Sequence, residues 1–251
     1  MIIQMQEIQS NGALGLSKFN FYFSELRRSL IYIILFFIIV FMCLAPFSKK
    51  IYNNLADPLQ KILPPNAHMI ATDITSTFVA PFKLVFFVTV TILIPFIFLR
   101  IYFFLREALY LKEKKVIFIF CSMSTLLFYF GILLGYFYIL PTVLSFFVSI
   151  APDTIIPMTD INQYLIFCIK FFLVLGFIFQ LPLVIVILIY FNFINVEDLI
   201  NKRPYALVLS FFIAMFITPP DIFSMAIAGI CIYILFELGL LISRIMLKYK
   251  E

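Results

Sequence analysis

Two polar segments that border apolar stretches hold carboxylates that could bind cationic groups. FYFSELRRSL, residues 21–30, places Glu25 between aromatic residues and two arginines. LREALYLKEKK, residues 105–115, places Glu107 and Glu113 within a strongly basic segment. A carboxylate in such a place can accept charge-assisted hydrogen bonds from a ligand, or it can form salt bridges within its own segment. The residues alone leave both interpretations open.

Other polar side chains stand inside apolar sequence. Gln180, in GFIFQLPLV, lies in the middle of a hydrophobic stretch, where an amide without a partner would be costly. Glu237, in ILFELG, could lie near the cytoplasmic end of the last stretch. Lys83 and Lys170 also fall at or inside apolar stretches. These residues are therefore candidates for contacts within the membrane.

Enzyme chemistry finds little support in the sequence. The single histidine, His68, has no second histidine or carboxylate pair near it. There is no H-E-x-x-H, no G-x-S-x-G and no glycine-rich phosphate loop. The four cysteines stand at unrelated spacings within apolar stretches, which favours buried thiols over disulfides or a metal site. We expect no catalytic residues, no metal and no cofactor.

The composition sets the class of protein. Of 251 residues, 64% are hydrophobic and 12% are charged, and the mean hydropathy is +1.13. A soluble domain of this size could not cover so much apolar sequence with polar surface. The sequence predicts an all-α integral membrane protein, a single polytopic domain of residues 1–251 with a cytoplasmic segment over residues 1–28.

Six apolar stretches are long enough to be read as membrane spans or short membrane helices. They cover about residues 29–47, 81–105, 116–148, 164–191, 205–218 and 222–242. The third is long enough to tilt strongly or to extend beyond the bilayer. The fifth has 14 residues, or roughly 21 Å of helix, which is less than a hydrocarbon core of roughly 30 Å. We therefore expect the bilayer to be thinner beside it.

A turn between the last two stretches is predicted by FITPPDIFSM, residues 216–225. Pro219 and Pro220 cannot continue the fifth helix, and Asp221 can cap the sixth. The alternative is one kinked helix from Tyr205 to Ile242, which would put an acid at membrane depth. The costs favour a hairpin.

The positive charges predict the orientation. With the N-terminus inside, the segments predicted to be cytoplasmic hold thirteen lysines and arginines, and the outer loops hold three. Cytoplasmic loops carry this excess in membrane proteins. Both termini are thus expected in the cytoplasm, and the net charge of +5 is explained by topology rather than by a nucleic-acid partner.

Nine short motifs follow one another along the chain, from about Phe21 to Arg244. They are ELR (25–27), ADPL (56–59), MIATDITSTF (69–78), EALYLKE (107–113), LLFYFGILLGYFYILP (126–141), FQLP (179–182), EDLINKRPY (197–205), ITPPD (217–221) and LFELG (235–239). In this order they resemble the motifs of the TatC family, the multi-spanning subunit of the twin-arginine, Sec-independent protein translocase.

This resemblance implies six helices in a cupped, glove-like bundle, with helices five and six short. It also implies a non-enzymatic function. Such a subunit binds twin-arginine signal peptides at the cytoplasmic face and assembles with TatA- and TatB-type single-span partners. Folded proteins then cross the membrane, driven by the proton-motive force. The expected setting is a homo-oligomer in the lipid bilayer of a bacterial cytoplasmic (inner) membrane, or of an organelle derived from one.

The resemblance also assigns roles to individual residues. Two guanidinium groups of a signal peptide call for carboxylates, and Glu113 and Glu25 match the family's glutamates. The expected signal-peptide site consists of Glu25, Arg27, Phe104, Tyr110 and Glu113. Gln180 and Glu237 are the expected polar contacts to partners within the membrane, and Pro219, Pro220 and Asp221 form the structural turn.

Three positions depart from the family pattern. Tyr22 stands where the family usually has histidine, and Glu107 where it has proline. Glu107 could add a third carboxylate to the site. Gln180 replaces a glutamate of the fourth helix, so an ionisable group is lost from the concave face.

Two other classes of protein compete with this interpretation. A small secondary transporter would also place polar residues in the membrane, but it typically shows repeat symmetry and broken helices in matching halves. We find no such repeat in the sequence. A membrane-embedded hydrolase would need a nucleophile and base at membrane depth, where Lys170 is the one conceivable base.

Overall fold

The computed structural model describes residues 24–62, 69–71, 74–106, 111–150, 158–217 and 222–248. Helix covers residues 24–44, and after it come η1 (Ala45–Phe47), α2 (Ser48–Ile62), α3 (Ile74–Arg106), α4 (Leu111–Leu134), η2 (Gly135–Ile139), α5 (Leu140–Ile150), α6 (Ile161–Ile178), α7 (Leu181–Tyr190), α8 (Val196–Asn201), α9 (Arg203–Ile217) and α10 (Ile222–Lys248). In these parts of the chain the only extended pairing is an isolated bridge between Ile70 and Asp160. The all-helical prediction is confirmed.

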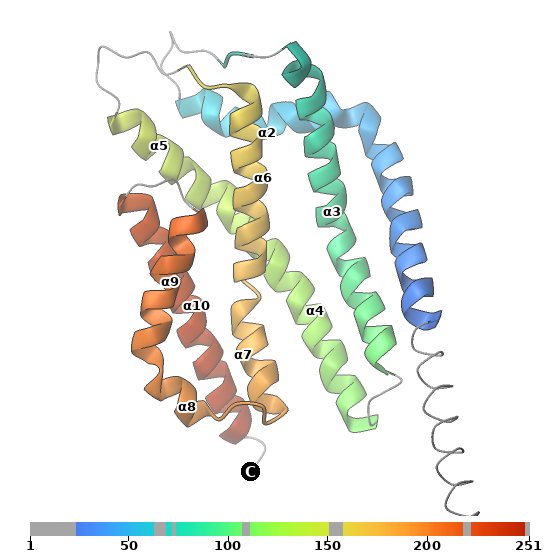
Figure 1. Ribbon diagram of the computed structural model, residues 1–251, viewed down its shortest axis with the longest axis vertical. Helices are drawn as coiled ribbons and strands as arrows, with labels where there is room; N and C mark the ends of the chain where they lie inside the picture. Colours follow the sequence, from blue (N-terminus) through green and yellow to red (C-terminus); the bar gives the residue numbers. More distant parts are fainter. Residues whose placement is uncertain are drawn as a thin grey trace, which may run out of the picture.

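The helices run between two ends of the molecule (Figure 1). We call them the α2 end, where α2 lies across the bundle, and the α8 end, where residue 24, α8 and the C-terminus of α10 lie. Five helical stretches have the length and apolarity to cross a membrane, and a shorter apolar helix covers Arg203–Phe216. These correspond to the six predicted stretches.

The last two helices form the predicted hairpin rather than one kinked helix. α9 and α10 lie side by side in Figure 1, and a Cβ at Gly229 of α10 would lie 2.9 Å from the Phe211 ring of α9. Pro219, Pro220 and Asp221, which were predicted to make the turn, lie outside the described residues.

The predicted length of the sixth apolar helix was wrong. α9 is short, with 15 residues, but α10 has 27 and extends to Lys248, past the expected end near Ile242. The added turns carry Arg244 and Lys248, and basic residues are favourable at a helix C-terminus and at a membrane surface.

The sequence reading missed α2, which covers a region expected to be an outer loop. Its residues are too polar on average to be read as a span, but Leu55, Ala56 and Leu59 are buried on one face. The opposite face carries the exposed Lys61–Asp57 ion pair. A helix of this kind lies at a membrane surface with its apolar side inward. In Figure 1 it crosses the bundle end beside α3 and α6.

Prolines inside helices leave carbonyl groups that tyrosines from neighbouring helices then bind. A proline has no N–H for the carbonyl four residues earlier. Pro58 thus frees the carbonyl of Asn54, which accepts a hydrogen bond of 2.9 Å from the Tyr136 hydroxyl. Pro95 frees the carbonyl of Thr91, which accepts one of 3.0 Å from Tyr129. These bonds join α2 to η2 and α3 to α4.

The third span is a single tilted rod of α4, η2 and α5 (Figure 1). Its middle is a π-helical turn in which the Leu140 N–H bonds to the carbonyl of Gly135, five residues earlier. Pro141 follows directly and cannot donate to Phe137, so the helix is already irregular at this point. Of the two alternatives that the length of this stretch allowed, Figure 1 shows a rod inclined to its neighbours.

Glycines allow α4 and α6 to approach closely. A Cβ at Gly131 would lie 2.8 Å from the ring of Phe179, and one at Gly135 would lie 2.7 Å from Leu175. From the other side, a Cβ at Gly176 would lie 2.5 Å from the ring of Phe128, which is fully buried. The GILLG pattern, which runs from α4 into η2, therefore has the packing role expected of small residues between membrane helices.

Candidate functional site

The predicted signal-peptide residues gather at the α8 end of the bundle. Glu25 and Arg27 lie in the first turn of helix 24–44, and Phe104 lies in the last turn of α3. Glu113 lies in the first turn of α4, although its side chain is outside what the structure describes. In Figure 1 these three helix ends lie at the same end of the molecule. Tyr110 and Glu107 fall in residues 107–110, outside the described residues, as does Tyr22.

A cluster of aromatic and arginine side chains holds helix 24–44 against α3 here. The Arg100 guanidinium carbon lies 4.4 Å from the ring centroid of Tyr32 and 4.9 Å from that of Phe96. Arg28 donates a hydrogen bond of 3.4 Å to the Tyr32 hydroxyl. One turn further, Phe36 stacks on Phe96 at 4.8 Å. Guanidinium groups over aromatic rings are attractive contacts, so the helix that carries Glu25 has a fixed place beside α3.

The sequence reading missed Tyr32 and Arg100. Arg100 was counted only as a cytoplasmic charge, and Tyr32 as part of an apolar stretch. The spacing of Arg28, Tyr32 and Phe36, each four residues from the next, places the three on one face of a helix and is the signal that could have revealed them. Their partners on α3 could not be read from the sequence.

Gln180 lies where the fourth span breaks into α6 and α7. Its side-chain Nε2 donates a hydrogen bond of 2.8 Å to the Ser124 carbonyl, and its Oε1 accepts one from the Ser124 hydroxyl. Ser124 is buried on α4, and Gln180 is half-buried. The amide therefore joins α4 to the break between α6 and α7. Its role toward a partner helix stays a prediction.

Glu237 forms the polar contact between α9 and α10. Its Oε2 accepts a hydrogen bond of 2.7 Å from Arg203, the first residue of α9, and its Oε1 accepts one of 3.1 Å from Tyr233. Both charged side chains are partly exposed, at 38% for Arg203 and 25% for Glu237. Because Arg203 begins the short helix α9 directly after α8, Glu237 lies toward the α8 end. Its place near the cytoplasmic side of the membrane stays a prediction. Arg203 itself was missed as its partner.

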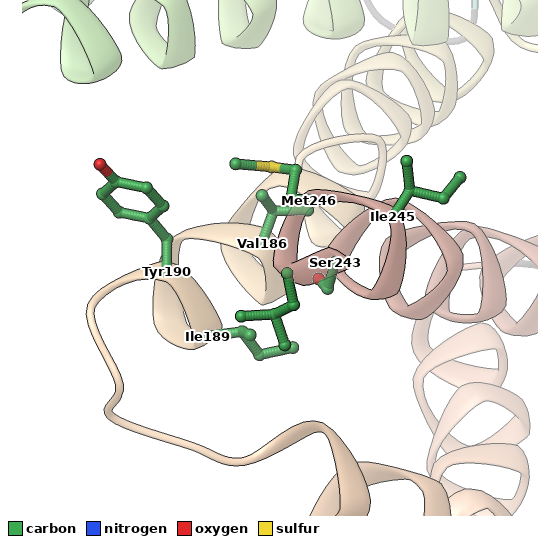
Figure 2. A pocket seen from close by; sticks show the side chains of 7 residues that line it. Val186, Ile189, Tyr190, Ser243, Ile245 and Met246 are labelled. Atoms are coloured by element: carbon green, nitrogen blue, oxygen red, sulfur yellow. The ribbon is translucent and has the colours of Figure 1, made fainter. Parts of the chain in front are cut away.

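A pocket of about 350 Å³ opens between α7 and α10 near the same end (Figure 2). Its lining is mostly aliphatic, and the hydroxyl groups come from Ser243 and Tyr190. Ser243 donates to the Gly239 carbonyl at 2.8 Å, and Tyr190 points away from the other side chains in Figure 2. The residues that line it supply no base beside a nucleophile.

In the described ranges, no three histidine, cysteine, aspartate or glutamate residues gather as metal ligands do.

The chain matches the model of one family, TatC, the Sec-independent protein translocase protein, over residues 22–230. It is 40% identical to the Sec-independent protein translocase protein TatC of Haemophilus influenzae over 220 residues, which cover 88% of this chain and 86% of that protein. The protein of the same name from Escherichia coli K12 is 39% identical, with 88% of this chain and 85% of that protein covered.

Solved structures of TatC also have a fold similar to that of this chain. A crystal structure of the twin arginine translocase receptor TatC is similar to this fold with a TM-score of 0.76 and 28% sequence identity. The match covers 89% of this chain and 98% of that one. A second crystal structure of that receptor, in the detergent DDM, gives a TM-score of 0.77. From its motifs, helix arrangement and relatives, this chain belongs to the TatC family of Sec-independent protein translocase proteins.

Proposed function

We propose that this subunit binds twin-arginine signal peptides at the α8 end, with Glu113 and Glu25 as the docking carboxylates. As a TatC protein it is a core membrane component of the twin-arginine translocase, a transport component rather than an enzyme. The observation that carries the proposal is the gathering of the ends of helix 24–44, α3 and α4 at one end of the molecule, where Arg100 of α3 also lies over Tyr32 of helix 24–44.

The electrostatics of this end support the proposal. A twin-arginine motif brings two guanidinium groups, for which carboxylates are matched acceptors. Lysines and arginines on the same helices repel loosely basic ligands. Phe104, half-buried on the last turn of α3, offers an apolar surface for the rest of the peptide.

The orientation that this function requires places the α8 end in the cytoplasm. The two ends of the described chain, residue 24 and Lys248, lie at the same end of the bundle, as six crossings require. Cysteine labelling from outside, in a background without the four native cysteines, tests the assignment. We expect labelling at Asn66 and none at Lys112, and the opposite pattern would invert the topology.

We further infer an assembly in the bacterial inner membrane. The translocase contains other subunits, and single-span TatA- and TatB-type proteins are the partners that the family resemblance implies. Gln180 and Glu237 are candidate contacts, and Arg27 is a candidate at the signal-peptide site. Copies of this chain are expected to associate within the complex.

Charge reversal tests the docking site. Glu113→Lys replaces an acceptor by a repelling charge and should abolish binding of a twin-arginine peptide. The loss is about 2–5 kcal/mol if the pair is desolvated and much smaller if it is exposed. Glu25→Lys should weaken binding less if it only supports Glu113. The measurement is photo-crosslinking of a twin-arginine signal peptide to the full chain in membranes.

A matched control is available on α8. Glu197 is exposed at the same end of the bundle, so Glu197→Lys makes the same charge change outside the proposed site. Its crosslinking should equal that of the parent chain. Unchanged crosslinking in Glu113→Lys would remove this residue as the docking acid, and an equal loss in Glu197→Lys would reduce the effect to general surface charge.

A further inference from the structure

An apolar groove opens on the side of the bundle between helix 24–44, α3 and α6. It has a volume of about 590 Å³, and its lining includes Phe41, Phe82, Phe86 and Ile166. Phe82 and Phe86 are 37% and 54% exposed, so the groove faces outward rather than into the core. A surface of this kind, on helices that cross a membrane, lies against lipid chains.

Two lysines interrupt this apolar lining. Lys83 lies nine residues after the start of α3, and Lys170 lies nine residues after the start of α6. Both helices start at the α2 end. There the backbone of Ile70, which precedes α3, bonds to Thr159 and to Ile161, the first residue of α6. Neither aspartate nor glutamate is among the residues that line the groove. Its only charges are therefore positive.

The depth of the lysines follows from their neighbours. The Tyr164 hydroxyl of α6 bonds to the Leu55 carbonyl of α2, at 3.0 Å, so Tyr164 lies at the level of this surface helix. Lys170 is six residues further along α6, or about 9 Å deeper. Lysines near the ends of membrane helices extend their ammonium groups toward the surface. Lys83 does so here, because its Nζ donates to Asn162 Oδ1 in the first turn of α6, at 3.1 Å.

Neither lysine is neutralised within the described part of the chain. Lys83 bonds to the neutral amide of Asn162, and both lysine side chains are exposed. A cation at this depth is costly without an anion. Positive charges are also concentrated at the α8 end, and lysines facing lipid near the α2 end are exceptions to that pattern.

We propose that this groove is a binding site for one acidic glycerophospholipid in the leaflet beside α2. The headgroup phosphate binds Lys83 and Lys170, and an acyl chain lies along Phe82, Phe86 and Ile166. Charge complementarity selects an anionic headgroup, and the apolar groove excludes free phosphate as the main ligand. The lipid would fill the gap between helix 24–44 and α6, and so support the helix that carries Glu25.

Native mass spectrometry of the purified full chain tests the site. Phosphatidylglycerol and phosphatidylcholine are titrated separately, and the apparent Kd of the first retained lipid is compared. We expect tighter binding of phosphatidylglycerol. Lys83→Gln and Lys170→Gln should each raise its Kd by about fivefold and leave that of phosphatidylcholine unchanged. Both positions are exposed, so the variants should retain the parent melting temperature.

A double variant of equal charge provides the control. Lys49 and Lys50 are exposed in the first turn of α2, away from the groove lining. Lys49→Gln/Lys50→Gln should leave the Kd of phosphatidylglycerol unchanged, whereas Lys83→Gln/Lys170→Gln should raise it. An equal effect of both double variants, or equal Kd values for the two lipids in the parent chain, would overturn the proposal.

A photo-crosslinking residue distinguishes lipid from a partner helix. Phe86 is replaced by p-benzoylphenylalanine, and the full translocase is irradiated in its membrane. A lipid adduct supports the proposal. A crosslink to a single-span protein would show that an acidic partner helix occupies the groove, and would overturn the lipid assignment.

Discussion

Helix 24–44 and the α6–α7 rod have similar apolarity but very different surroundings. Their most apolar windows have the same mean hydropathy of 2.9, yet 44% of the α6–α7 window is buried and none of the first. α6 lies at the centre, against α3 and α4, and supplies much of the main core. Helix 24–44 lies at the edge and is held by ring contacts along α3.

This difference in burial corresponds to two roles, because α6 packs the core and helix 24–44 carries the proposed recognition residue Glu25. In a membrane, lipid satisfies an apolar helix as well as protein does, so burial depends on close packing and polar contacts rather than on hydrophobicity. The α6–α7 rod has both, through Gly176 of α6 and Gln180 at the break before α7. Helix 24–44 has mainly aromatic and cation–π contacts near the end that carries Glu25. The proposed recognition residue Glu25 therefore stands on a peripheral helix that contributes little to the buried core.

The largest effect on stability is expected from overpacking of α6, the central helix. Gly176→Leu would drive a side chain into the Phe128 ring, which is fully buried. We expect a loss of about 1–3 kcal/mol in the free energy of unfolding, measured by steric trapping in bicelles. Ile34→Phe enlarges a side chain that is 57% exposed on helix 24–44 and should cost far less. Equal losses would refute the contrast.

Gln180→Leu tests the polar contact at the break in the rod. It leaves the Ser124 hydroxyl and carbonyl without their partner and should cost about 0.6–2 kcal/mol of unfolding free energy. Gln180→Glu should retain export of a twin-arginine reporter, because a protonated carboxyl group can donate to the Ser124 carbonyl and accept from the Ser124 hydroxyl. Co-purification of single-span partners is measured alongside. If Gln180→Leu loses partners at unchanged stability, the amide serves the interface rather than the rod.

A double-mutant cycle tests the tyrosine that binds a proline-freed carbonyl. Tyr129→Phe removes the bond to the Thr91 carbonyl and should cost about 1 kcal/mol. Pro95→Ala restores an N–H for that carbonyl, so Tyr129→Phe should cost less in the Pro95→Ala background. Urea or SDS unfolding of the four proteins gives the coupling. Strict additivity would show that the two residues act independently.

The smallest global effect is expected at the edge helix. Arg100→Gln removes the cation that lies over Tyr32 and Phe96, with little change in melting temperature. Hydrogen exchange in the first turns of helix 24–44 should become about two- to fivefold faster. Arg106→Gln, at the exposed end of α3, is the matched control. Unchanged exchange in Arg100→Gln would mean that the ring stacking alone holds this helix.

Features that depend on local sequence were predicted correctly. The six apolar stretches and the separation of the α9–α10 hairpin follow from hydropathy and from proline, because each acts within a few residues. The family motifs were equally local, and membership is confirmed. Gln180 and Glu237 were singled out because polar groups in apolar sequence need partners.

The partners themselves were decided by the tertiary structure. Ser124 and Gln180 are 56 residues apart, and Arg203 and Glu237 are 34 apart, so no local pattern joins them. α2 was missed because its residues are too polar on average to be read as a span, although Leu55 and Leu59 stand at helical spacing in the sequence. The sequence by itself determined which segments enter the membrane, since that depends on the transfer of each segment from water to lipid. The structure decided which helix is central and which is peripheral, because lipid solvates both and only packing distinguishes them.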